Sequence, residues 1–320
     1  MACRKTKPLY NPLYKFLFVY NPQAQFQQLT KETISQGLSL LCKTGNKLQY
    51  AFVKLNLEDK RLSDITAISS FIYIRFLDLS MNHLSDLSPL ASLKDLLWLK
   101  VDNNAVSCFE RQSFDQLTYL QWLSVAGNRV TDIKGLVGPS LESLNLTGNG
   151  IHRMTGFQED YFKNLVTLDL TGNNLETTNG INLPKLQQLY LARNAIKSLE
   201  GLDKLERLTI LHLRDNQIDS LDGLNPSMKS LKYLNIRGNA VAEEKALQNL
   251  SHVSKTLRAL VLSENPLVET SDYRLSVLVI LPKLERLDKN PISPDERSDA
   301  PHKIGNDEQN EEMSGFTFLT

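Results

Sequence analysis

The sequence predicts an α/β repeat fold, a curved horseshoe of stacked coils with a parallel β-sheet on its concave face. Two observations support this prediction. An 11-residue pattern recurs every 21–26 residues over most of the chain, and leucine supplies 57 of the 320 residues. One coil of this length cannot bury its own leucines, whereas stacked coils bury them against one another. The prediction therefore rests on periodicity and not on any single segment.

The recurring pattern is LxxLxLxxNxL, in which Ile, Val or Phe can replace Leu. Nine copies match it, at residues 74–84, 96–106, 120–130, 141–151, 165–175, 186–196, 208–218, 231–241 and 257–267. A tenth, degenerate copy at 52–62 carries Lys60 where the asparagine belongs. Nine matches leave little room for chance, and the pattern is that of the leucine-rich repeat.

Each position of the repeat has a physical role. The LxL part is a short strand whose leucines face the core and whose middle residue faces out. The asparagine stands where the chain turns away, so its amide can bond backbone groups that the turn leaves unpaired. We expect these amides to pair with one another as a ladder. The short repeat leaves no room for a long helix, so the convex side is expected to hold 3₁₀ or irregular turns.

The N-terminal end of such a solenoid needs a cap over its first coil. We expect this cap at 30–46, as a helix that Thr30 begins and that runs to Leu41. About ten repeats follow at 47–269. The preceding residues, 1–29, carry four basic and no acidic side chains among several aromatic ones. They are expected to form a disordered arm.

The C-terminal end is expected to be closed by a second cap at 270–288. Its helix would begin at Ser271 or Asp272 and end at Leu281, where a proline follows. The tail at 289–320 has seven acidic and three basic residues. This composition predicts a polar, disordered segment.

The composition also limits what the protein does. Lys and Arg number 36, as do Asp and Glu, and a net charge of zero argues against binding nucleic-acid phosphates. No glycine-rich phosphate loop, HExxH or GxSxG motif occurs, and the five histidines are scattered. Three distant cysteines form no framework and favour an intracellular, reducing compartment. We expect no catalysis, cofactor, metal, small-molecule substrate or membrane span.

Aromatic residues gather at one outward position of the predicted strands. Three consecutive repeats place Phe76, Trp98 and Trp122 there, and these include both tryptophans of the protein. Large rings on a solvated sheet suit an anchor for a protein partner. The alternative is that the rings stack only to stiffen the sheet.

A second candidate cluster comes from three later repeats. It comprises Tyr190, Arg193, His212, Arg214, Tyr233 and Arg237. Arginine beside tyrosine is typical of binding hot spots and suits an acidic partner. Asp215 and neighbouring acids could instead neutralise these arginines, and the sequence leaves both interpretations open.

Several strings go beyond the repeat pattern. They are GLSLLCKTGN at 37–46, INLPKLQQLYLARN at 181–194, LHLRDNQIDSL at 211–221, MKSLKYLNIRGN at 228–239, LRALVL at 257–262 and the segment from YR to LPKLERLDK at 273–289. In these strings the chain resembles the radial spoke head leucine-rich repeat proteins of motile cilia and sperm flagella. The resemblance covers about four-fifths of the chain.

This resemblance implies a structural, protein-binding subunit of the radial spoke head that supports spoke assembly and motility. It implies other spoke head subunits as partners and a place in the cytoplasm and the ciliary or flagellar axoneme. Both tails depart from the family pattern, which has an acidic N-terminal extension and a long, charged C-terminal one. A rival interpretation, from the same short repeat subclass, is a regulator of a protein phosphatase catalytic subunit. A third is a membrane-trafficking adaptor that uses residues 1–29.

Overall fold

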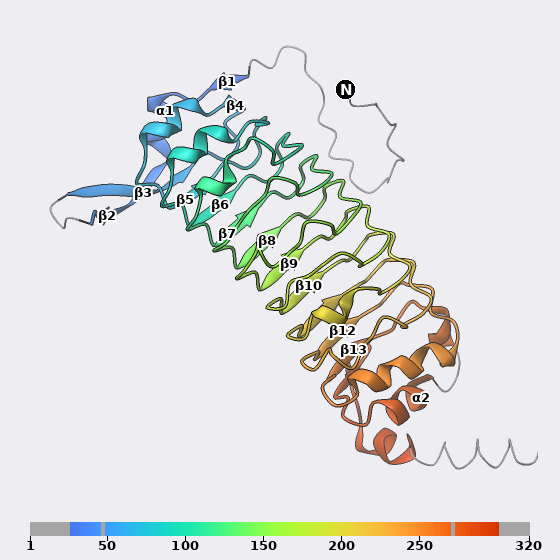
Figure 1. The fold of residues 1–320 in the computed structure, drawn as a ribbon. Coiled ribbons are helices and arrows are strands. Elements are labelled where there is room, and N and C mark those ends of the chain that lie inside the picture. Colours follow the sequence, from blue (N-terminus) through green and yellow to red (C-terminus); the bar gives the residue numbers. More distant parts are fainter. Residues whose placement is uncertain (1–25, 46–48, 270–272, 301–320) are drawn as a thin grey trace, which may run out of the picture.

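A curved solenoid forms the body of the protein (Figure 1). The structure, a computed structural model, describes residues 26–45, 49–269 and 273–300. A 13-stranded sheet runs along the whole solenoid, and its strands lie side by side in chain order. The strands of successive repeats pair in parallel, whereas the strand at each end pairs antiparallel. The predicted leucine-rich-repeat solenoid is thus confirmed.

The parallel part of the sheet contains one strand per coil. These strands are β3 Tyr50–Asn56, β5 Phe76–Asp78, β6 Trp98–Lys100, β7 Trp122–Ser124, β8 Ser143–Asn145, β9 Thr167–Asp169, β10 Gln188–Tyr190, β11 Ile210–His212, β12 Tyr233–Asn235, β13 Ala259–Val261 and β14 Arg286–Leu287. The middle leucine of each strand from β5 to β13 is fully buried. The residues on either side of it therefore face the opposite, concave side, as the period-2 pattern predicts.

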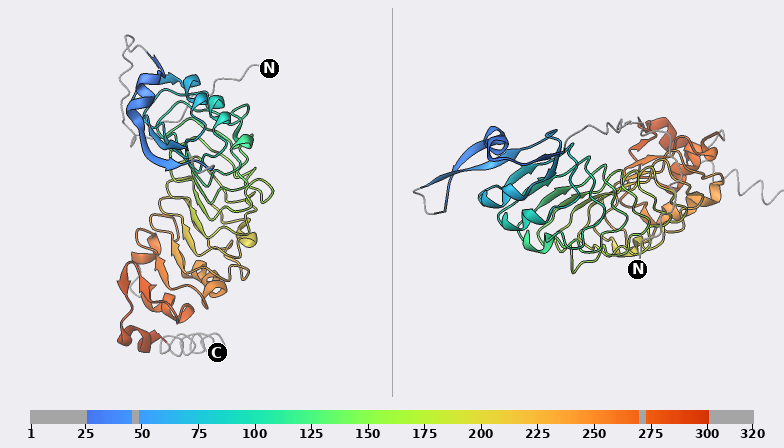
Figure 2. Two further views of the ribbon diagram at one scale, coloured as in Figure 1. Left: turned by 90° about the vertical axis from the view of Figure 1, so that its left-hand side faces the viewer. Right: turned by 90° about the horizontal axis from the view of Figure 1, so that it is seen from above.

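Short 3₁₀ helices form much of the convex side, as the repeat length predicts. They are η1 Thr66–Ser70, η2 Ser88–Ser92, η3 Phe114–Gln116, η4 Leu202–Lys204, η5 Glu244–Val253 and η6 Pro266–Glu269. Each helix directs at least one buried apolar side chain at the core, such as Ile68 in η1 and Leu202 in η4. Figure 2 shows the sheet on one side of the solenoid and these turns on the other.

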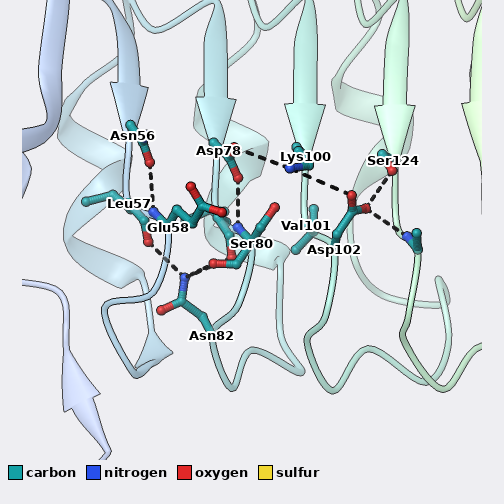
Figure 3. Close-up of polar contacts among 12 residues, drawn as sticks. Asn56, Leu57, Glu58, Asp78, Ser80, Asn82, Lys100, Val101, Asp102 and Ser124 are labelled. Carbon is teal, nitrogen blue, oxygen red and sulfur yellow. Dashed lines mark hydrogen bonds and ion pairs between the residues drawn. The ribbon is translucent and has the colours of Figure 1, made fainter. Parts of the chain in front are cut away.

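The repeat asparagines tie neighbouring coils together through the backbone. Asn173 is representative: its Nδ2 donates to the carbonyls of Leu146, in the preceding coil, and Leu170, both at 3.0 Å. Its Oδ1 accepts from the N–H of Ile151, also at 3.0 Å. Figure 3 shows part of the same arrangement at Asn82. The expected amide-to-amide ladder is wrong, because the amides satisfy backbone groups that each turn leaves unpaired.

The N-terminal cap is a short helix followed by a hairpin strand. Helix α1, Lys31–Gly37, begins as predicted, with the Thr30 hydroxyl accepting from the Thr33 N–H at 3.2 Å. It ends at Gly37 and not at Leu41. The next residues form β2, Leu38–Lys43, which pairs antiparallel with β3. The strand gives the edge of the first coil the hydrogen-bond partners that a helix there would not provide.

The residues just before this cap are also ordered. Strand β1, Gln27–Gln28, pairs in parallel with β4, Leu62–Asp64, in a separate two-stranded sheet. Leu29 is buried beside it. The expectation of a disordered arm at 1–29 therefore does not hold for residues 26–29, and residues 1–25 lie outside the described part.

Helix α2, Tyr273–Ile280, closes the C-terminal end (Figure 1). The predicted N-caps, Ser271 and Asp272, lie outside the described residues. The helix ends close to Leu281 as predicted, and the Leu281 N–H still bonds the Val277 carbonyl at 2.8 Å.

Residues 289–300 differ from the expected disorder. Strand β15, Asn290–Pro291, pairs with β14, and residues 294–300 are helical. Arg297 Nη2 donates to the Leu284 carbonyl at 2.8 Å, and Ala300 is buried in the core cluster. These contacts hold in place a polar segment whose composition alone predicts disorder. In the ranges that the structure describes, none of the helices has the length and apolar content to cross a membrane.

Candidate protein-binding face

The concave face presents the first and third residue of each three-residue strand. The parallel register aligns Phe76, Trp98 and Trp122 across β5, β6 and β7, next to Lys54 on β3 and Ser143 on β8. All three rings are partly exposed, while the leucine that follows each of them is fully buried. The structure therefore brings the three predicted aromatic residues together on one solvent-facing row.

The two tryptophans stack face to face. Their ring centroids lie 4.5 Å apart and their planes differ by 7°. Stacked rings on a pleated face keep one broad apolar surface in a fixed orientation. Such a surface loses little conformational entropy when a partner covers it. The stacking supports the rigidifying interpretation, and both tryptophans remain partly exposed to solvent.

A row of charged side chains lies next to the tryptophans, where the strands end. It is not among the sites predicted from the sequence. Lys100 lies between Asp78 and Asp102, with its Nζ 3.8 and 4.0 Å from their carboxylates (Figure 3). Asp102 Oδ1 also accepts from the Ser124 hydroxyl at 2.5 Å and from the Ala126 N–H at 2.9 Å. The row gives the apolar pair a polar rim with two acids and one base. The sequence does contain a signal for this charged row, because acidic and basic residues alternate at the ends of adjacent strands, at Asp78, Lys100 and Asp102.

The second predicted cluster forms a row on β10, β11 and β12. The rings of Tyr190 and His212 have centroids 6.1 Å apart, and those of His212 and Tyr233 are 6.4 Å apart with planes at 15°. Burial and the nearby Asp169 raise the pKa of the Tyr190 hydroxyl. Tyr190 therefore keeps an uncharged hydroxyl, and the three rings present apolar faces on the concave side.

The arginines of this cluster are partly neutralised. Asp215 Oδ2 lies 3.1 Å from Arg214 Nε and 3.7 Å from Arg193 Nε. Arg237 pairs with Glu264. Three cations thus share two anions, so the neutralisation that the sequence left open does occur.

His212 is held in its neutral form by its neighbours. Asn235 Oδ1 accepts from the Arg237 N–H at 3.0 Å, which fixes the amide so that its Nδ2 faces His212 Nε2 at 3.0 Å. A donor at that position requires an unprotonated Nε2. Burial, and then the positive charge of Arg214, lower the pKa of His212, against smaller opposite effects of Asp169 and Asp215.

We expect acidification to weaken the fold through His212. Because the folded-state pKa lies below the unfolded value, the unfolded chain binds the proton first as the pH falls below about 6.5. Stability is thus lost below that pH, and above about 7.5 His212 contributes no pH dependence. Urea unfolding of wild type and His212→Gln from pH 8 to 5 checks this. The wild type should lose more stability than the variant, and parallel curves would contradict the expectation.

Other kinds of site find no support in the described residues. No group of three or more His, Cys, Asp or Glu side chains in that part of the chain is placed to hold a metal ion. A shallow apolar hollow of about 190 Å³ lies beside the β2–β3 hairpin. It is lined by Leu38, Ala51, Phe52, Ser70, Phe71 and Tyr73. It is smaller than the roughly 300 Å³ of small-molecule pockets, and fits a single side chain.

Comparison with known proteins agrees with this architecture. A family model described as leucine-rich repeat matches residues 164–314, and a second matches 139–152. The TLR13–ssRNA13 complex has a similar fold, with a TM-score of 0.64 at 24% identity over 75% of this chain and 36% of that one. InlJ of Listeria monocytogenes gives 0.55 at 20% identity over 77% and 56%. At such identities the likeness concerns the fold alone.

Curated relatives are much closer in sequence. Leucine-rich repeat-containing protein 23 of Homo sapiens is 51% identical over 272 residues, which are 85% of this chain and 78% of the relative. The Bos taurus protein of that name is 50% identical over the same shares. Human cilia- and flagella-associated protein 410 is 35% identical over 37% of this chain and 38% of its own. The chain therefore belongs to the family of leucine-rich repeat-containing protein 23.

Proposed function

We propose that this chain is a non-catalytic scaffold of the radial spoke head in motile cilia and sperm flagella. On this proposal it binds other spoke head subunits through its concave face and supports spoke assembly and motility. Membership of the leucine-rich repeat-containing protein 23 family supports the proposal, as does the similarity to a cilia- and flagella-associated protein. Its place would be the axoneme.

The stacked pair Trp98 and Trp122 carries the proposal. Tryptophan is among the residue types most enriched in binding hot spots, and an aromatic pair with a charged rim has the composition of an interface core. Neither ring fills the core of the solenoid, because Leu99 and Leu123 do so. Loss of the rings should therefore weaken binding without unfolding the coil.

We expect the double variant Trp98→Ala, Trp122→Ala to bind its axonemal partner roughly 30-fold more weakly, in line with a hot spot of about 2 kcal/mol. The test is extraction of motile cilia expressing each chain, with detergent and then with high salt. Wild type should stay with the stripped axoneme and the variant should be released. Circular dichroism of the purified chains checks that both are folded.

A matched control comes from Tyr119 and Tyr161, which are 60% and 47% exposed and lie outside the concave strands. The variant Tyr119→Ala, Tyr161→Ala should be retained like wild type. Equal retention of the tryptophan variant would show that the concave rings are not the anchor. Release of wild type by detergent alone would contradict the spoke assignment and favour a phosphatase regulator.

A further inference from the structure

One edge of the solenoid, where the strands begin, carries a row of basic side chains in its C-terminal half. Residues stack there directly from coil to coil: the N–H of Lys232 bonds the Thr209 carbonyl, and the N–H of Arg258 bonds the Lys232 carbonyl, both at 2.9 Å. We call the five segments just before or at the start of β10 to β14 the basic edge. They are residues 184–187, 204–209, 227–232, 254–258 and 282–286.

The basic edge holds nine basic and two acidic residues, a net charge of +7. The basic residues are Lys185, Lys204, Arg207, Lys229, Lys232, Lys255, Arg258, Lys283 and Arg286. The corresponding segments of the five preceding coils, at 71–75, 93–97, 117–121, 138–142 and 162–166, have three basic and two acidic residues, a net charge of +1. The charge is therefore confined to one half of the edge and does not follow from the repeat itself.

These cations are mostly unneutralised. Eight of the nine side chains are exposed, and Arg258 is half-buried. In the described part of the chain, the one ion pair within the basic edge joins Arg258 to Glu285 at 3.7 Å. Neighbouring coils lie about 4.8 Å apart, well inside the Debye length of about 8 Å, so the like charges repel one another. An anionic segment along this edge would relieve that repulsion.

The residues that precede an acidic segment of the same chain pack against the basic edge. Arg297 donates to the carbonyls of Pro282 and Leu284, both in the last segment of the basic edge. Ala300 is buried beside it, in the core cluster. Residues 301–320 then carry four acids, Asp307, Glu308, Glu311 and Glu312, and a single lysine, Lys303.

The lengths match as well. The four acids follow Ala300 by 7 to 12 residues. At about 3.3 Å per residue this segment spans up to about 23–40 Å, and four coil steps of about 4.8 Å make the basic edge about 19 Å long. The carboxylates can therefore meet any coil of the basic edge.

We propose that the acidic segment after Ala300 binds along the basic edge of its own chain through Asp307, Glu308, Glu311 and Glu312. The contact leaves the concave face open, because every residue of the basic edge except Arg286, at the start of β14, precedes the strands. An acidic partner of the basic edge would have to displace this segment first. The acidic segment thus competes with such a partner for a surface that is separate from the tryptophan row.

Carbodiimide cross-linking of the full chain tests the proposal, because it joins carboxylates only to amines in direct contact. The four acids should cross-link to Lys229, Lys255 and Lys283, and these links should fall at least tenfold between 50 and 500 mM NaCl, as expected for screened charges. Lys197 and Lys245 provide the matched control, since both are exposed on neighbouring coils outside the basic edge. Equal linking to the controls, or no linking of the acids, would overturn the proposal.

Two further arms make the result specific. In a mixture of nitrogen-14 and nitrogen-15 chains, the links should join peptides of one isotope, and mixed-isotope links would show binding to a second copy and overturn the proposal. The variant Lys229→Glu, Lys255→Glu should reduce links to the unchanged Lys283 and Lys232 at least fivefold. Unchanged links would overturn the electrostatic basis, provided circular dichroism shows a wild-type fold.

Discussion

Replacing Asn173 with alanine is expected to lower the free energy of unfolding by about 3–5 kcal/mol, because a buried N–H left unpaired costs about 1–3 kcal/mol and each of two further hydrogen bonds that are lost costs about 0.5–1.5 kcal/mol. The change leaves the Ile151 N–H without its acceptor. It also removes one of the two asparagine donors to each of the Leu146 and Leu170 carbonyls, which keep their bonds from Asn149 and Asn194. Asn173 is only 6% exposed, so water does not replace the amide. Guanidinium unfolding followed by circular dichroism measures the loss.

The next residue provides the control. Asn174 is exposed, and its backbone N–H bonds the Ile151 carbonyl whatever its side chain is. Asn174→Ala should stay within about 0.5 kcal/mol of wild type, as exposed substitutions do. If the two variants lost equal stability, the inter-coil role of the buried amide would be wrong.

Replacing Gly223 with alanine is expected to destabilise the chain by about 3 kcal/mol, the upper range for overpacking of a tight contact. A Cβ at this position would lie 1.9 Å from the Leu199 carbonyl oxygen of the preceding coil. Because the clash is with backbone, two coils must separate to relieve it. The midpoint of thermal unfolding should fall accordingly.

Gly150 is a matched position with space around it. Its nearest neighbours to an added Cβ lie at 3.6 Å, and its φ is not in the left-handed region. Gly150→Ala should therefore be neutral or gain about 0.4–1 kcal/mol, because alanine restricts the unfolded chain. A similar loss at both glycines would contradict the close approach of coils at Gly223.

Much of the concave face could be predicted because the repeat fixes its register. Once the two leucines of each strand are assigned to the core, Trp98 and Trp122 have to stand side by side on the other face, and they do. The sequence left open whether Asp215 pairs with Arg214, since the pairing depends on side-chain geometry within one turn. The basic edge was within reach of the sequence, because lysine or arginine recurs shortly before five consecutive strands.

The ends were harder to predict, for a different reason. The string at 38–43 has apolar residues at spacings that suit either a helix or a strand, and the free edge of β3 decides between them. Residues 290–300 have a polar sequence that is typical of a disordered segment. In the structure, however, Arg297 donates hydrogen bonds to two backbone carbonyls and Ala300 packs into the core. Such contacts are specific to this chain and not to the repeat.

The bonds that Asn173 and its counterparts make between coils have a mechanical consequence. Two rows of hydrogen bonds, the sheet and the asparagine amides, run along the concave half of the molecule from coil to coil. Hydrogen bonds keep a narrow range of lengths, whereas the convex turns are joined by many weak apolar contacts and by scattered hydrogen bonds, such as that from the Thr178 hydroxyl to the Glu200 carbonyl. We therefore expect that, when the solenoid is flexed, the concave half keeps its length and the convex turns absorb most of the strain. On this expectation the protein behaves as a curved beam whose concave side is the stiffer one.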